Sequence, residues 1–145
     1  MLGAGFVTSF ELDDSAISDF TDNIAEFEID NIDIIQGDVQ DELFNGITCD
    51  TVVMNPPFGT KNNEGIDMLF LDQACGIAQS AVYSFHKTST RDFIVKRMEG
   101  RGYRIEVLSE MKFEVPKMYK MHKKNMVHVD VDFIRIAIGS SEDRG

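Results

Sequence analysis

The sequence predicts an α/β fold, an open sheet whose strands alternate with helices and end in an antiparallel hairpin. Short apolar runs alternate with segments whose apolar residues recur at helical spacing, which is typical of an α/β sheet. The last two apolar runs follow one another without a helical segment between them, which indicates the hairpin. With 145 residues, 43% of them hydrophobic, the chain is long enough to bury the core of one domain.

The first half is expected to contain a strand, a helix and two further strands. Residues 6–12 predict a short strand, and the Asp and Ser side chains of residues 13–15 can cap a following helix. Residues 32–35 predict the second strand. Residues 51–54 predict the third, and their apolar sequence indicates burial on both faces. The helix is marked by apolar residues at i, i+3, i+7 and i+10: Ile17, Phe20, Ile24 and Phe27.

The second half is expected to add two helices and three strands. A strand over residues 81–85 is followed by a helix that Ser89 or Thr90 caps and that reaches about Glu99. The final hairpin comprises residues 103–109 and 127–138. The helix before residue 81 is marked by a second apolar stripe: Met68, Leu71, Cys75 and Ala78.

Two features of the final hairpin are expected to be irregular. Residues 112–126 are basic and contain a proline, which predicts an irregular loop. In the last strand the apolar positions change phase between Phe133 and Ile134, which predicts a bulge or burial on both faces there. The polar residues 139–145 predict a disordered tail.

Composition excludes several protein classes. No run approaches the roughly 18 apolar residues needed to span a bilayer, and the N-terminus lacks the features of a secretory signal. Cys49 and Cys75 form no CxxC pair, so we expect no disulfide framework. His86 and His122 have no Cys or His partner at ligand spacing, so we expect no metal site. We therefore expect an intracellular protein of the cytoplasm, the nucleus or both.

The net charge of −11 is unevenly distributed. Residues 1–60 hold 13 acidic residues and no Lys or Arg, whereas residues 87–124 hold 11 basic and 5 acidic residues. This distribution fits two solvated faces, or a nucleic-acid footprint confined to the C-terminal half.

The most specific motif is Asn55-Pro56-Pro57-Phe58, at the carboxyl end of an apolar strand, where open α/β sheets place their sites. An adenine amine is a poor nucleophile because its lone pair is delocalised into the ring. The Asn55 oxygen and the Pro56 carbonyl can accept its hydrogens and aim the lone pair at a sulfonium methyl group, while the prolines hold both acceptors rigid. Phe58 offers a ring on which a base can stack. The alternative is a rigid Pro-Pro turn with a packed aromatic residue.

Two acids follow the first two strands, where a methyl donor would need them. Glu11 can chelate a ribose diol, and Asp38 can accept an adenine amine while Val39 packs on the ring. Asp13 is the second candidate for the ribose, with a helix cap as its simpler role.

A basic group follows the strand at residues 81–85 and continues in the loop after it. It can hold a phosphate backbone, although a capped helix start and a solvated loop are the simpler interpretation. The residues predicted to bind RNA are Lys87, Arg91, Lys120, Lys123 and Lys124.

Across nearly its whole length the chain resembles the family of methyltransferase-like protein five, the eukaryotic adenosine methyltransferases of small-subunit ribosomal RNA. The resemblance is carried by NIAEFEIDNIDIIQGDV, DTVVMNPPFGTKNNEGIDM, AVYSFHKTSTR and HKKNMVHVDVDFIRI. It implies a Rossmann-like class I methyltransferase sheet, S-adenosyl-L-methionine as donor and N6-methyladenosine as product.

The resemblance also implies roles for residues and a partner. Asn55 to Phe58 are then catalytic, Asn55 also contacts the cofactor, Glu11 holds the ribose, and Asp38 with Val39 holds the adenine. The family usually has Asp at the position of Glu11. A small zinc-ribbon activator subunit is implied as heterodimer partner, adding a strand to the sheet edge at residues 31–36.

Relative to the family, the chain lacks the first, central strand and its glycine-rich loop. Residues 1–138 are therefore expected to be a partial methyltransferase domain that alone binds cofactor weakly and folds poorly. The sequence fits an isoform, a partial gene product or a fragment.

Three other functions stay open. A protein glutamine N-methyltransferase uses the same amide-accepting chemistry but ordinarily has Tyr at position 58. A truncated, non-catalytic chain could bind only the zinc-ribbon activator. A DNA adenine methyltransferase would share the motif at residues 55–58.

Overall fold

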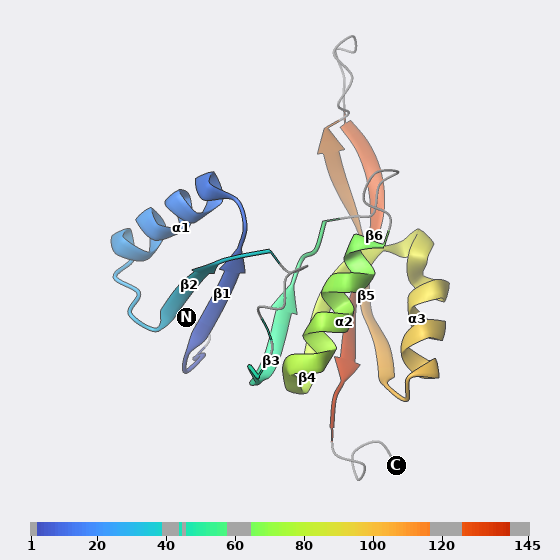
Figure 1. Cartoon of the computed structure of the whole chain (residues 1–145). Coiled ribbons are helices and arrows are strands. Elements are labelled where there is room, and N and C mark those ends of the chain that lie inside the picture. The colour runs from blue at the N-terminus through green and yellow to red at the C-terminus, as the bar shows by residue number, and fades with distance from the viewer. Residues whose placement is uncertain (1–2, 39–43, 45, 58–64, 117–125, 140–145) are drawn as a thin grey trace. The chain divides into compact units, whose positions relative to one another are not determined.

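The computed structural model describes residues 3–38, 44, 46–57, 65–116 and 126–139 (Figure 1). The chain divides into two compact units, Met1–Asn45 and Gly46–Gly145. We describe each unit by itself. The prediction of one partial domain over residues 1–138 stays a prediction.

The first unit is a strand–helix–strand segment. Strand β1 (Val7–Glu11) is followed by helix α1 (Asp14–Glu26) and strand β2 (Ile32–Gln36). The two strands are parallel, with Val7 opposite Ile32 and Glu11 opposite Gln36. Parallel strands end at the same edge of a sheet, so the residues after β1 and β2 are neighbours. Both strands and the helix lie where the sequence predicts them.

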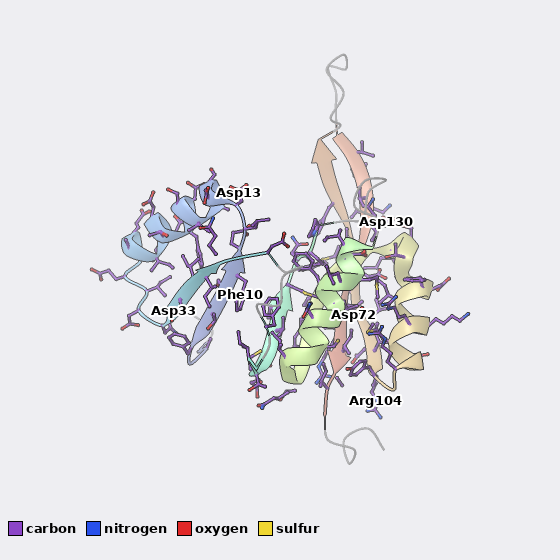
Figure 2. The ribbon with its side chains drawn as sticks, viewed as in Figure 1. Phe10, Asp13, Asp33, Asp72, Arg104 and Asp130 are labelled. Atoms are coloured by element: carbon purple, nitrogen blue, oxygen red, sulfur yellow. The ribbon has the colours of Figure 1, made fainter. Side chains whose placement is uncertain are left out.

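Helix α1 begins at a capped residue. The Asp13 carboxylate accepts the backbone N–H of Ser15 at 2.7 Å and that of Ala16 at 3.3 Å, which satisfies donors that no helical carbonyl can reach (Figure 2). The predicted cap is therefore confirmed. Asp13 acts as a helix cap, the simpler of its two predicted roles.

The second unit contains a sheet in the order β3-β4-β6-β5, in which β3 and β4 are parallel and the other pairs antiparallel. Helices α2 and α3 and the short 3-10 helix η1 connect the strands (Figure 1). The elements are β3 (Cys49–Met54), α2 (Ile66–Ile77), β4 (Ala78–Lys87), η1 (Thr88–Thr90), α3 (Arg91–Gly100), β5 (Arg104–Pro116) and β6 (Met126–Ala137).

The core of this unit lies between its helices and one face of its sheet. Leu71 of α2 and Met98 of α3 are fully buried, as are Val82 of β4 and Ile136 of β6. Burial of such side chains stabilises by about 1.5–3 kcal/mol each. Within the described part of the chain, no helix is both long and apolar enough to cross a membrane.

Three sequence predictions for this unit are wrong. Strand β3 is not buried on both faces, because Val52 and Met54 pack against the core on one face whereas Val53 on the other face is 74% exposed. Thr90 precedes α3 but makes no capping hydrogen bond. Its hydroxyl donates to the Lys87 carbonyl instead. Residues 112–116 are strand rather than loop, because they continue to pair with β6.

The predicted irregularity of the last strand has its counterpart in β5. Val107 pairs with Ile134 and Ser109 pairs with Phe133, so Leu108 is an extra residue that interrupts the register. A bulge is therefore present at the predicted level of the hairpin, but the partner strand carries the added residue.

Candidate active site

The carboxyl ends of β1 and β2 hold the two acids that the sequence assigns to the cofactor. Glu11 is the last residue of β1, and its carbonyl accepts the N–H of Gly37 at 3.1 Å, so the chain beyond β2 stays beside it. Asp38 is the next residue and is half-buried. The parallel register thus brings Glu11 and Asp38 to one edge of this unit.

The carboxylate of Glu11 is oriented by the backbone of the two residues that follow it. Its Oε1 atom accepts the N–H of Leu12 at 3.0 Å and that of Asp13 at 3.1 Å, and the side chain is exposed. Carboxylates at this edge have the acceptor chemistry that a ribose diol or an adenine amine requires. Val39 lies outside the described residues.

In the second unit, the motif begins directly after β3. Asn55 and Pro57 are exposed, whereas Pro56 is buried. The buried proline anchors the backbone between two side chains that face solvent, so the amide of Asn55 is accessible on a constrained segment. Phe58 lies outside the described residues.

A polar cluster lies beside the motif, on the face of the sheet that α2 and α3 cover. Ser84 and His86 of β4 and Asp132 of β6 are at most 1% exposed. His86 pairs with Asp132 in register, and Ser84 pairs with Met54, the residue before Asn55. The sequence prediction did not include Ser84, Asp132 or the contact of His86 with Asp67. The sequence signal for this polar cluster is a Ser and a His at alternate positions, on the same side of the strand as the apolar Val82.

Arg91, predicted to bind RNA, is paired within the protein. Its Nε atom donates to Asp132 at 2.5 Å, and its Nη2 atom donates to Asp132 at 2.6 Å and to Glu110 at 3.1 Å. The hydrogen bond from Arg91 is the largest of the causes that hold the pKa of Asp132 below its usual value, with a further contribution from Thr88. Arg91 therefore compensates a buried carboxylate, and its binding of RNA stays a prediction.

We expect the substitution Arg91→Met to destabilise the chain in a pH-dependent way. A carboxylate with a lowered folded pKa contributes stability above its unfolded pKa and loses it as the pH falls through the folded value. The urea midpoint of the variant should lie below that of the wild type at pH 7. The difference between the two midpoints should narrow below pH 3.8, the ordinary pKa of an Asp carboxyl such as that of Asp132. Urea unfolding monitored by circular dichroism measures this.

Arg97→Met is the matched control, because Arg97 pairs with the partly exposed Asp72 (labelled in Figure 2) and such surface pairs contribute little. An unchanged midpoint for Arg91→Met, together with weaker RNA binding, would instead assign Arg91 to RNA.

An open hollow of about 430 Å³ lies where β4 ends and β6 begins. Lys87 and the Ser89 hydroxyl favour a phosphate there, whereas the carboxylate of Asp130 opposes one. The lining residues are Lys87, Thr88, Ser89, His128, Val129 and Asp130. The other predicted RNA-binding residues, Lys120, Lys123 and Lys124, lie outside the described residues. The described residues contain no group of three His, Cys, Asp or Glu placed to hold a metal ion.

Comparison with solved structures agrees with this arrangement of strands. The structure of a candidate RNA methyltransferase from Pyrococcus horikoshii matches with a TM-score of 0.79 at 31% identity, over 96% of this chain and 66% of that chain. This likeness shows that the chain has the Rossmann-like fold of a methyltransferase. No protein-family model matches the chain.

Comparison with curated proteins narrows the class. The chain is 48% identical over 136 residues to the rRNA N6-adenosine-methyltransferase METTL5 of Danio rerio, covering 93% of this chain and 66% of that protein. It is 43% identical over 142 residues to the enzyme of the same description from Drosophila melanogaster, covering 97% of this chain and 67% of that protein. The chain thus belongs to the METTL5 family of rRNA N6-adenosine methyltransferases, and it spans about two thirds of the length of these relatives.

Proposed function

We propose that the chain transfers a methyl group from S-adenosylmethionine to the N6 amine of an adenosine in small-subunit ribosomal RNA. The observation that carries this is Asn55, an exposed amide at the carboxyl end of β3, held by the buried Pro56. Relatives that are 43–48% identical are described as rRNA N6-adenosine methyltransferases.

Asn55 and Pro56 act on the amine that is methylated. The Asn55 side-chain oxygen and the Pro56 carbonyl oxygen accept its two N–H groups, which draws the nitrogen toward tetrahedral geometry and frees its lone pair. S-adenosylmethionine supplies an activated methyl group, so the N–C bond forms as the S–C bond breaks and the amine loses a proton to solvent. The protein contributes position rather than covalent chemistry.

Glu11 and Asp38 are the proposed ligands of the cofactor. Their chemistry fits, because a carboxylate accepts hydrogen bonds from ribose hydroxyls and from an adenine amine. We assign the ribose to Glu11 rather than to Asp13, because Glu11 ends β1 at the edge that it shares with the end of β2, whereas Asp13 caps α1.

For the RNA, we propose that its backbone passes over the hollow beside Lys87. Lys87 and the Ser89 hydroxyl line the hollow and can donate to a phosphate there, whereas the Thr88 hydroxyl already donates to Asp132 at 2.8 Å. Since ribosomal RNA is made in the nucleus and used in the cytoplasm, we propose that the chain acts in one or both compartments.

We further propose a zinc-ribbon activator subunit as partner, bound by strand addition at β2. In the described part of the chain β2 pairs with β1 alone, and Ile35 of β2 is 38% exposed. An edge strand with unpaired backbone groups and an exposed apolar side chain has the features that strand addition uses.

Calorimetric titration of S-adenosylmethionine tests the cofactor site. We expect binding to the chain co-purified with its zinc-ribbon partner and loss of that binding in Asp38→Ala. No binding to a folded complex would contradict the assignment. Binding of the partner without binding of the cofactor would favour a non-catalytic chain whose only role is to bind the activator subunit.

A labelled-methyl assay on a mixture of RNA and protein tests the substrate class. We expect the label in RNA. Equal or preferential labelling of protein would favour a glutamine N-methyltransferase.

A further inference from the structure

His86 joins two parts of the second unit through its two ring nitrogens. Its Nε2 atom is 2.8 Å from the Ser84 hydroxyl, and its Nδ1 atom is 3.5 Å from an Asp67 carboxylate oxygen. In the neutral ring with its proton on Nδ1, the Ser84 hydroxyl donates to Nε2, whereas Nδ1–H lies near the Asp67 carboxylate without meeting hydrogen-bond geometry. Burial lowers the pKa of His86 and so favours this neutral form, whereas the nearby carboxylates of Asp67 and Asp132 act in the opposite direction.

These contacts lie at the two ends of the segment that bears the catalytic motif. Ser84 pairs with Met54, so the segment begins beside it at Asn55. Asp67 belongs to the first turn of α2, so the segment ends beside it at Gly65. His86 thus contacts both Ser84 and Asp67.

Helix α2 lacks a capping side chain at its own start. Its N-cap residue is Gly65, with φ of 83°, which offers no side chain to the first N–H groups of the helix. The contact of Asp67 with the imidazole of His86 therefore attaches the first turn to the sheet by a polar contact. Side chains buried beside a site in this way hold its geometry more than they add stability.

We propose that Ser84, His86 and Asp67 form a buried relay that fixes both ends of residues 55–65, and that His86 is thereby a positioning residue for methyl transfer. His86 does not contact the substrate and acts through Asn55 and Pro56. The effect on catalysis rests on the proposed function. The effect on the motif segment does not.

The test compares Asp67→Ala with Asp67→Asn in the full chain. The Ala variant removes the polar group that lies beside Nδ1–H, and the Asn variant keeps a polar group there. Asp67 is partly accessible, with 13% of its side chain exposed, so both variants are expected to fold. Asp72→Ala is the matched control, because it removes another carboxylate of α2 that pairs with Arg97 and Arg101 instead.

Hydrogen exchange is the first readout. We expect amides of peptides spanning residues 52–70 to exchange about tenfold faster in Asp67→Ala, near the wild-type rate in Asp67→Asn, and unchanged in Asp72→Ala. Unchanged exchange in Asp67→Ala, or equal acceleration in Asp72→Ala, would overturn the relay, whether or not the chain is active.

Steady-state kinetics is the second readout. We expect kcat for methyl transfer to fall about tenfold in Asp67→Ala, with KM for S-adenosylmethionine unchanged and with recovery in Asp67→Asn. A fall in kcat without recovery by Asn would overturn the positioning role. If the wild type transfers no methyl group at all, the proposed function is wrong. The hydrogen-exchange rates of the Asp67 variants then still test whether the relay holds the motif segment.

Discussion

Replacement of Asn55 by Ala is expected to lower kcat for methyl transfer at least about a hundredfold. Removing one preorganised hydrogen-bonding group from a site typically costs a factor of about 10² to 10³ in kcat. The amide of Asn55 is exposed and the following Pro56 is buried, so the change removes an acceptor without removing packing. Initial rates at saturating RNA and cofactor measure this effect.

The matched control is Asn23→Ala, an exposed residue of α1 outside the motif, which should leave kcat unchanged. Thermal unfolding of both variants should resemble that of the wild type. An Asn55→Ala variant that retains more than a tenth of the wild-type kcat would exclude Asn55 as the main acceptor for the amine.

Replacement of Leu71 by Ala is expected to destabilise the second unit by about 2–5 kcal/mol, because it leaves a cavity in a close-packed core. Leu71 is fully buried in α2 and belongs to the cluster that includes Val82 and Ile136. Urea unfolding measures the loss.

Phe93→Ala is the control for this prediction. Phe93 lies on α3 and is 58% exposed, so its removal should change the free energy of unfolding by about 0.5 kcal/mol or less. A similar loss for the two variants would contradict the core described above.

Local sequence pattern predicts much of this fold. The stripe from Ile17 to Phe27 and the cap at Asp13 predict α1, because helical spacing and capping act within a few residues. Strand β5 was predicted to end at Ser109. Its continuation to Pro116 depends on pairing with β6, and a contact between distant segments leaves little local signal in a basic stretch.

For the candidate site the sequence is informative where the chemistry lies in one short motif. Asn55 and Pro56 are recognisable because they adjoin each other at a strand end. The relay is not recognisable from the sequence, because the packing of α2 on β4 brings Asp67 and His86 together. The charge of Arg91 and its place after a strand predict RNA binding, whereas the buried Asp132 with which it pairs lies 41 residues away in the sequence.

The most direct test of the central claim is the identity of the methylated nucleoside. The chain with its zinc-ribbon partner would be incubated with unmethylated small-subunit ribosomal RNA and S-adenosylmethionine carrying a heavy methyl group. Mass spectrometry would then be run on the digested nucleosides. We predict heavy N6-methyladenosine, absent with Asn55→Ala. A heavy methyl group on another nucleoside, or only on protein, would contradict the proposed function.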